Sequence, residues 1–369
     1  MTLVSNSENQ TKPSLVDMQR LQAVLFPHWI LWAFPSLLLG ICWLVDFFNA
    51  RIGVSKFGYE LSLGQLPVIA VLMLWRYLRF HAFDWFSHRL WMVMVMLLWI
   101  MYIGSKINLY SHMLMALGLP LVDNTLLAAD KFLGFNWNAY ARFLVENPWR
   151  NIFFSAIYSS FSFIALFLTL LIALLRNDRL RMLEFCFLMV TTSVTCSTIA
   201  GLFPSYPTFY SVAEPALSNS MKAQGVYYLG EVSALLTKLR EAPAVVIDPG
   251  YLLGVVGFPS FHTCLALIIV RCNRGFWPLN TLALLLGLAT VIATPVYGGH
   301  YLVDVIGGAA IAWFFVWLWT AKISKHVAAS MPSTDAGAFQ PLNSPEFPRH
   351  PAGSFCASLQ TQPATACHF

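Results

Sequence analysis

The stretch GGHYLVDVIGGAAIAWFFVWLW, residues 298–319, decides the class of this protein. Beyond Asp304 it carries no charge, and the apolar run over residues 301–321 has the length that a helix needs to cross a hydrocarbon core, about 20 residues. His300 and Asp304 stand at the mouth of this run. Ionisable groups are costly in hydrocarbon and usually face a cavity, a partner or a substrate. The stretch therefore predicts both a transmembrane helix and a functional site.

The whole chain has the composition of a membrane protein. Of its 369 residues, 58% are hydrophobic and 11% are charged, whereas a soluble domain carries about 25% charged residues. We expect an all-α fold, a polytopic transmembrane helical bundle of about eight spans. The expected spans lie near residues 22–48, 61–78, 90–110, 150–175, 182–203, 259–272, 277–296 and 301–321.

The segments outside these spans divide the chain into regions. Residues 1–21 are polar and should form a cytoplasmic N-terminus, followed by a transmembrane domain over residues 22–329. Residues 330–369 are rich in Pro, Ser, Ala, Gln and Thr without hydrophobic periodicity, which predicts a disordered cytoplasmic tail. Residues 111–149 mix tryptophan, charge and leucine. They are expected either to lie at the membrane interface and shape a lipid entrance or to serve as a plain connector.

The basic residues predict the orientation. The net charge of +5 is scattered over loops, which argues against nucleic-acid binding. By the positive-inside rule, the segments after spans two, four, six and eight should be cytoplasmic. The residues concerned are Arg76, Arg79, Arg89, Arg176, Arg179, Arg181, Arg271, Arg274, Lys322 and Lys325. The charge-balanced loop 204–257 then lies on the opposite side, so that His262 and His300 share the non-cytoplasmic face of what we expect to be the cell (inner) membrane.

Two histidines and one aspartate carry the expected chemistry. His300 and Asp304 are four residues apart, which places them on one helix face. The carboxylate can orient the imidazole and raise its basicity, as a nucleophile requires. His262 follows Pro259 and Ser260 at a helix start, a natural anion site, where it could protonate a leaving group. A lone histidine in an apolar span is more often structural, but the pairing with Asp304 favours catalysis.

These segments also carry a family resemblance. Pro259-Ser260-Phe261-His262 and Gly299-His300-Tyr301-Leu302-Val303-Asp304 resemble the second and third signatures of the type 2 phosphatidic acid phosphatase superfamily. The phrase from Gly298 to Gly308 is most similar to the branch related to yeast inositol phosphorylceramide synthase. The resemblance covers residues 250–310 clearly and residues 90–320 loosely.

The resemblance implies an integral membrane phosphohydrolase or phosphotransferase that acts on a lipid or isoprenoid phosphate through a phosphohistidine intermediate. It implies that His262 is the acid, His300 the nucleophile and Asp304 the group that orients it. An inositol phosphorylceramide synthase-like head-group transferase stays open. So does a non-catalytic phospholipid-binding or transport protein.

Substrate contacts are expected around the two signatures. Gly298 and Gly299 would let the backbone approach a ligand, and Ser260, beside Phe261, could either cap its helix or bind phosphate. The chain departs from the family pattern where Thr294 replaces a phosphate-binding arginine and where residues 201–210 lack any basic residue. We expect Arg240, in the loop before Pro259-Ser260-Phe261-His262, to supply the missing cation; further candidates are Lys106, Arg142, Lys222 and Lys238.

No cofactor and no metal is expected. A His-x-x-x-Asp spacing supplies too few ligands for a divalent ion, and the seven cysteines show no metal or disulfide spacing. The expected partners are a lipid phosphate substrate and the membrane, with no nucleic acid. The oligomeric state is left open, as is the choice between hydrolase and transferase.

Overall fold

A computed structural model describes residues 52–54, 97, 100, 103–176, 179–224, 228–247 and 253–329 of the chain. These residues are almost all helical, and the all-α class is confirmed. The exception is a parallel pairing of two three-residue strands, β1 (Ile52–Val54) with β2 (Val245–Ile247). Expectations for residues 1–21, 22–48, 61–78, most of 90–110 and 330–369 fall outside the described residues.

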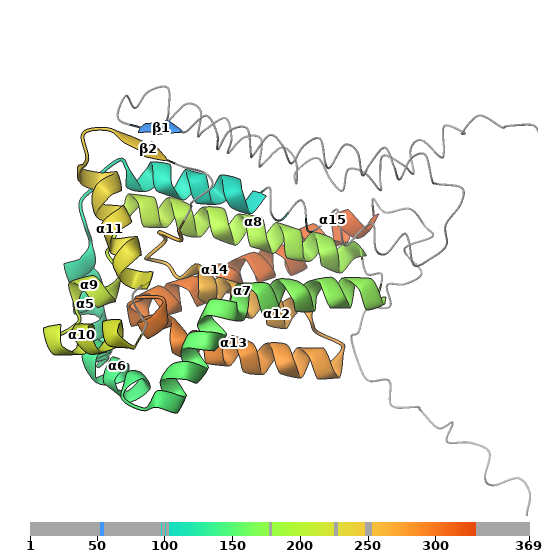
Figure 1. The fold of residues 1–369 in the computed structure, drawn as a ribbon. Helices are drawn as coiled ribbons and strands as arrows, with labels where there is room; N and C mark the ends of the chain where they lie inside the picture. Colours follow the sequence, from blue (N-terminus) through green and yellow to red (C-terminus); the bar gives the residue numbers. More distant parts are fainter. Residues whose placement is uncertain are drawn as a thin grey trace, which may run out of the picture. The chain divides into compact units, whose positions relative to one another are not determined.

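Long apolar helices run side by side and form the main body (Figure 1). Because these helices are apolar over most of their surface, they can face both lipid and each other. They are α7 (Pro148–Arg176), α8 (Arg179–Leu202), α12 (Phe261–Cys272), α13 (Trp277–Tyr297) and α14 (Leu302–Leu318), joined by a helix over residues 103–115. A π-helical turn, η1 (Trp319–Ile323), and α15 (Ser324–Ala329) continue α14.

Within the described part of the chain, three helical stretches have the length and hydropathy of membrane spans: Leu180–Leu202, Trp277–Tyr297 and Leu302–Val327. The two halves of α7, Pro148–Phe161 and Phe163–Ile172, meet at 55° and make a fourth if they count as one span. These match the spans expected near 150–175, 182–203, 277–296 and 301–321. The span expected near 259–272 is the shorter helix α12, and a total of eight stays a prediction.

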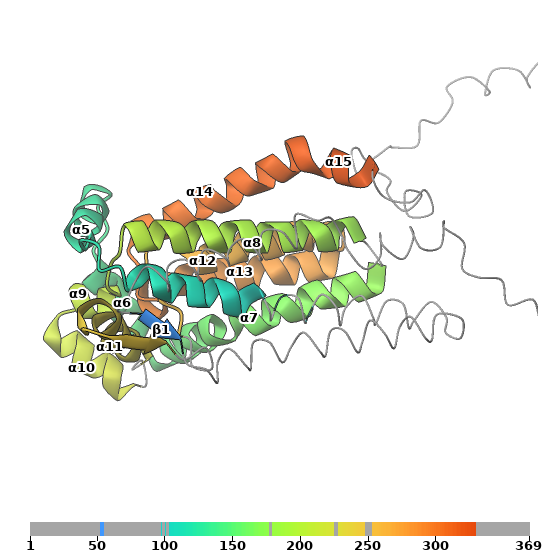
Figure 2. The ribbon, with the colours of Figure 1, turned by 90° about the horizontal axis from the view of Figure 1, so that it is seen from above.

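Short helices gather at one end of the long ones (Figures 1 and 2). They are α5 (Asp123–Phe132), α6 (Trp137–Val145), α9 (Thr208–Ser211), α10 (Pro215–Ala223) and α11 (Tyr228–Glu241). α6 packs on α13, where the Trp137 indole N–H donates to Pro295 O at 2.8 Å and the Tyr140 hydroxyl donates to Ile292 O at 2.8 Å. The segment expected to be interfacial thus contains a helix that is an integral part of the packing.

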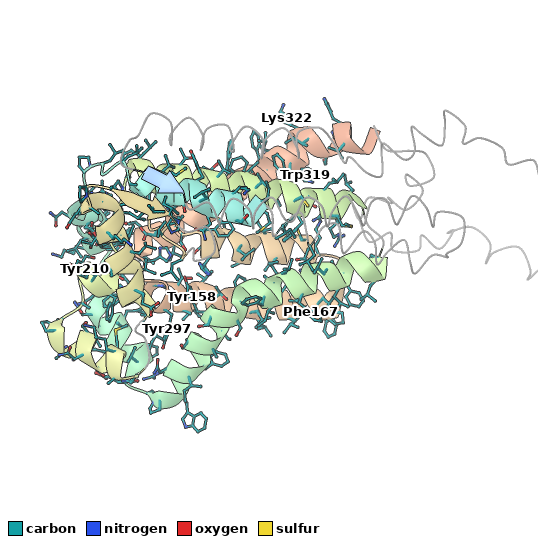
Figure 3. The ribbon with its side chains drawn as sticks, turned by 45° about the horizontal axis from the view of Figure 1, so that its top comes forward. Tyr158, Phe167, Tyr210, Tyr297, Trp319 and Lys322 are labelled. Atoms are coloured by element: carbon teal, nitrogen blue, oxygen red, sulfur yellow. The ribbon has the colours of Figure 1, made fainter. Side chains whose placement is uncertain are left out.

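Basic side chains mark the opposite end of the bundle. The Glu184 carboxylate, 1% exposed, pairs with Arg271 and Arg274 at 2.8 Å each. The guanidinium of Arg181 donates to Cys272 O at 3.0 Å, which ties α8 to the end of α12. Figure 3 shows Trp319 and Lys322 far from Tyr158 and Tyr297, which lie nearer the short helices. Among the described residues, basic segments that follow α7, α12 and α14 therefore lie at this end, where Arg176 donates to Gly275 O and Arg271 donates to the Thr320 hydroxyl.

A close contact joins the two helices that carry the signatures. A Cβ added at Gly308 of α14 would lie 2.2 Å from the Ser260 carbonyl oxygen, so only glycine allows this approach to the start of α12. Beside it, the Cys264 thiol donates to Gly308 O at 3.1 Å. The small residue at position 308 thus lets α14 pack closely against the start of α12.

Candidate active site

The starts of α12 and α14 lie together. The Ser260 N–H donates to Asp304 O at 2.9 Å, which connects the residue before α12 to the first turn of α14. His262 is the second residue of α12, and His300 stands two residues before α14. α13 runs between them and returns the chain to the same end. Hence two histidines that are 38 positions apart in sequence line one cavity.

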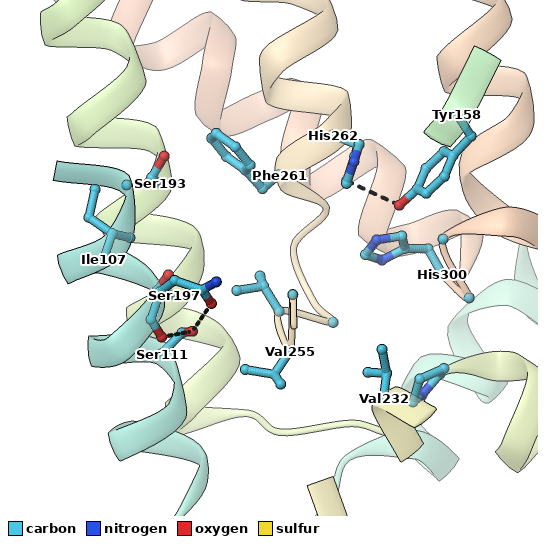
Figure 4. A pocket seen from close by; sticks show the side chains of 18 of the residues that line it. Ile107, Ser111, Tyr158, Ser193, Ser197, Val232, Val255, Phe261, His262 and His300 are labelled. Atoms are coloured by element: carbon cyan, nitrogen blue, oxygen red, sulfur yellow. Dashed lines mark hydrogen bonds between the residues drawn. The ribbon is translucent and has the colours of Figure 1, made fainter. Parts of the chain in front are cut away.

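This cavity has a volume of about 640 Å³ and two unlike sides. Figure 4 shows Tyr158, His262 and His300 grouped on one side, with Ser111, Ser193 and Ser197 on the other. Its described lining contains no lysine, arginine, aspartate or glutamate side chain. Within that lining, charge can come only from the imidazoles and the phenols of Tyr158 and Tyr297.

His300 is held by the carboxylate four residues later. Its Nδ1 lies 3.1 Å from Asp304 Oδ2, and the two side chains are 4% and 1% exposed. The same oxygen accepts the Tyr301 N–H at 3.0 Å, so Asp304 fixes the ring and the helix start together. An ionised carboxylate only accepts hydrogen bonds, so with Asp304 ionised the ring would donate from Nδ1 and a neutral His300 would keep its lone pair on Nε2.

His262 is held by a tyrosine from another helix. The Tyr158 hydroxyl of α7 lies 3.0 Å from His262 Nδ1, and the two rings stack with centroids 4.4 Å apart. A Cβ at Gly298 would lie 2.5 Å from the Tyr158 oxygen and 2.7 Å from His300 Cδ2. The absence of a side chain at Gly298 thereby leaves room for both Tyr158 and His300 beside its main chain. Tyr158 was missed in the sequence, where no spacing connects it to either signature.

The other residues expected to contact substrate divide into two groups. Phe261, Gly298 and Gly299 line the cavity, and Gly299 has a φ of 66°, which favours glycine. Ser260 is fully buried and does not line it. It is the N-cap residue of α12, yet its hydroxyl makes no capping hydrogen bond.

Arg240 is not brought to the histidines. It lies near the end of α11, donates from Nη2 to Leu119 O at 2.7 Å, and does not line the cavity. Thr294, where a typical family member has arginine, is buried in α13 with its hydroxyl bonded to Thr290 O at 2.7 Å. The other candidate cations lie elsewhere: Arg142 pairs with Glu214, and Lys222 lies over the Phe209 ring. The expectation that Arg240 binds phosphate gains no support from this placement.

The start of α12 offers main-chain donors instead. The N–H of Cys264 bonds to Ser260 O at 3.4 Å. The N–H groups of the three residues before Cys264 have no acceptor within the helix. They stand at the positive end of a 12-residue helix that also carries His262. Such an arrangement suits an anion. As for metals, no cluster of three or more His, Cys, Asp or Glu side chains occurs among the described residues.

Comparison with known proteins identifies the family. A family model described as the PAP2 superfamily matches residues 124–318, over half of the chain. The chain belongs to the PAP2 superfamily. The match extends from α5 to the last residue of α14 and includes both signatures. PAP2 proteins generally have phosphatase activity, so membership supports a phosphatase- or phosphotransferase-type function on lipid phosphates. Neither a search of curated proteins nor a search of solved structures found a match to this PAP2 protein.

Proposed function

We propose that this PAP2 protein is an integral membrane phosphohydrolase or phosphotransferase that acts on a lipid or isoprenoid phosphate through a phosphohistidine intermediate. The observation that carries the proposal is that His262 and His300 line one cavity while Asp304 holds Nδ1 of His300. Two imidazoles in one cavity, one held by a carboxylate and the other by a phenol, suit the different roles of nucleophile and acid.

In the first half-reaction, the Nε2 lone pair of His300 attacks phosphorus and the ester P–O bond breaks. His262 gives its proton to the departing alkoxide, which leaves as an alcohol. The Asp304 carboxylate stabilises the positive charge that develops on the His300 ring. In the second half-reaction, water or an acceptor alcohol loses a proton to His262 and attacks phosphorus. The P–N bond then breaks and His300 is restored.

Phosphate binding is proposed to rest on main-chain donors. No lysine or arginine is among the described residues that line the cavity. Two sets of donors are proposed to bind the phosphate oxygens: the N–H groups at the start of α12, and the hydroxyls of Ser155 and Ser159 on α7. Neutral donors bind a dianion less tightly than a bidentate guanidinium does, which favours a substrate with one remaining phosphate charge.

The site is proposed to face the non-cytoplasmic side. The arginines around Glu184 lie at the start of α8 and the end of α12, whereas His262 lies at the start of α12. The positive-inside rule assigns that basic end to the cytoplasm. In a bacterium the reaction would then take place on the periplasmic leaflet of the inner membrane.

A second candidate, a head-group transferase like inositol phosphorylceramide synthase, is favoured by the far side of the cavity. Ser111, Ser193 and Ser197 bring hydroxyl groups there, opposite the histidines (Figure 4). The cavity is also far larger than one phosphoryl group requires. Neutral polar groups at this place would suit a hydroxyl-bearing acceptor or head group, which a hydrolase does not need.

The test is a turnover assay with the purified protein in lipid nanodiscs. The substrates are phosphatidic acid, isoprenyl pyrophosphate, phosphatidylglycerol phosphate and phosphatidylinositol, each with and without diacylglycerol or ceramide. Phosphate release without an acceptor supports the hydrolase, and product formation only with an acceptor supports the transferase. Lipid binding without turnover of any substrate would reject both in favour of a non-catalytic lipid-binding protein.

Tyr158→Phe should lower kcat by roughly three- to tenfold, the value of one lost hydrogen bond. The phenyl ring keeps the stacking on His262, but the imidazole loses the bond that fixes its Nδ1. Steady-state kinetics against Tyr297→Phe give a matched control. The Tyr297 ring also lines the cavity, but its hydroxyl donates to Asn151 at 2.8 Å and to no histidine. Equal losses in the two variants would refute a specific role for Tyr158.

A further inference from the structure

A buried carboxylate in α5 is bonded to the start of α14. Asp130 is 1% exposed. Its Oδ2 accepts the Leu302 N–H at 2.9 Å, and its Oδ1 accepts the Val303 N–H at 3.0 Å. Leu302 and Val303 lie 172 and 173 positions after Asp130 in the sequence, so these hydrogen bonds are tertiary contacts. Both oxygens of one side chain are used on a single helical turn.

These two N–H groups are the first of α14 and have no acceptor within their own helix. The turn is otherwise closed by its own residues: Tyr301 N–H donates to Asp304 Oδ2 at 3.0 Å, and Asp304 N–H donates to Tyr301 O at 3.2 Å. Asp130 therefore supplies the remaining acceptors for the turn that carries Asp304. Its negative charge at a helix N-terminus is also favourable to the helix dipole.

The same layer of short helices holds the neighbouring residues. Asp123, the first residue of α5, accepts the Tyr301 hydroxyl at 3.1 Å. The Thr208 N–H at the start of α9 donates to Gly299 O at 2.9 Å. The main chain on both sides of His300 is thus attached to helices outside the long bundle. Asp130 makes two bonds to the first turn of α14, both to main-chain N–H groups.

Burial raises the pKa of the Asp130 carboxyl, while the bonds from Leu302 and Val303 oppose that rise. Each of the two hydrogen bonds needs an acceptor oxygen, and the ionised carboxylate supplies two such oxygens. The neighbouring Lys131 is exposed. The described partners of the Asp130 oxygens are therefore the two main-chain N–H groups of α14.

We propose that Asp130 is a positioning residue for the reaction, acting through the first turn of α14 to keep Asp304 and His300 in productive geometry. The inference rests on the proposed function, in which His300 attacks phosphorus. A reacting group that is misplaced by about 1 Å can lower the reaction rate a hundredfold. A carboxylate that touches neither substrate nor histidine can thus control the rate.

The first test is Asp130→Asn, which keeps the side-chain volume but replaces one acceptor oxygen with a donor. We expect kcat to fall between about tenfold and a hundredfold, with KM changed less than about twofold because the cavity lining is untouched. Leu126→Ala is the matched control. Leu126 is a buried residue of the same helix α5, and its loss loosens packing without removing a bond to α14. If both variants lose stability but only Asp130→Asn loses kcat, the role is positional.

The second test is a double-mutant cycle with Asp304→Asn, itself expected to cause a partial loss. If Asp130 acts through the Asp304 turn, the double variant should lose less than the product of the two single losses. A multiplicative loss would mean that Asp130 acts elsewhere.

A substrate-independent readout separates this inference from the proposed function. With ring-¹⁵N-labelled histidine, the Nδ1 resonance of His300, assigned with a His300→Gln variant, should shift or broaden in Asp130→Asn and not in Leu126→Ala. A wild-type protein without turnover would reject the proposed function, yet a shifted resonance would still support the positioning contact. Unchanged kcat together with an unchanged resonance in Asp130→Asn would overturn the inference.

Discussion

His300→Ala should reduce turnover by about a thousandfold or more, because the proposed covalent route loses its nucleophile. The wild-type protein incubated with ³²P-labelled substrate and quenched in base should retain label on the protein, since phosphohistidine survives base and is lost in acid. The variant should retain none. Asp304 would then face a small void in place of the ring that lies 3.1 Å from its oxygen.

A second buried histidine provides the control for this experiment. His112 is 1% exposed and bonds through Nδ1 to Asn108 O at 2.8 Å, but it does not line the cavity. His112→Ala removes an imidazole of similar burial, so its effect should be on stability rather than on turnover per folded molecule. Base-stable label on the His300→Ala protein would refute the nucleophile assignment.

His262→Ala should lower turnover of an alkyl phosphate ester by about 10²- to 10⁴-fold, the usual contribution of a positioned acid or base. The loss of the first half-reaction should be much smaller with an aryl phosphate such as p-nitrophenyl phosphate, because nitrophenolate leaves without a proton. The measurement is the burst of nitrophenol release set against steady-state turnover. The variant should keep the burst and accumulate phosphoenzyme, since attack by water still needs a base.

The leaving-group comparison makes this test specific. A variant that is simply misfolded or that fails to bind phosphate would lose both substrates equally. If His262→Ala slows the first half-reaction equally with the alkyl and the aryl ester, the role of His262 as the acid is contradicted. Tyr158 stacks on His262 and could move into the space that His262→Ala leaves. If the site collapsed in this way, the burst amplitude would fall as well.

The sequence was informative where a contact is local. The four-residue spacing of His300 and Asp304 predicted the hydrogen bond found between them. The expected shared helix face was wrong, because His300 lies before the N-cap residue Tyr301 and Asp304 lies in the first turn of α14. Apolar runs of sufficient length predicted α8, α13 and α14, since in lipid a backbone must satisfy its own hydrogen bonds. Charge bias placed the segments after spans four and six on one side, and among the described residues Arg271 and Arg274 pair with Glu184 near the start of α8.

It was uninformative where a contact joins distant segments. Arg240 was chosen because it lies in the loop before Pro259-Ser260-Phe261-His262, but nothing in that position reveals that its side chain bonds to Leu119 O. Tyr158, 104 positions before His262, is one tyrosine among 13 in the chain. The absence of lysine and arginine from the described lining of the cavity likewise followed from the arrangement of helices and not from any local pattern.

By itself, the amino-acid sequence determined that the chain is a helical membrane protein and that two histidines stand at helix starts, because hydropathy, charge bias and helical spacing act between near neighbours. Only the tertiary structure decided which side chains surround them: Tyr158 on His262, Asp130 on the first turn of α14, and serines across the cavity. Such contacts depend on how helices pack, and packing is set by the combined shape of many side chains.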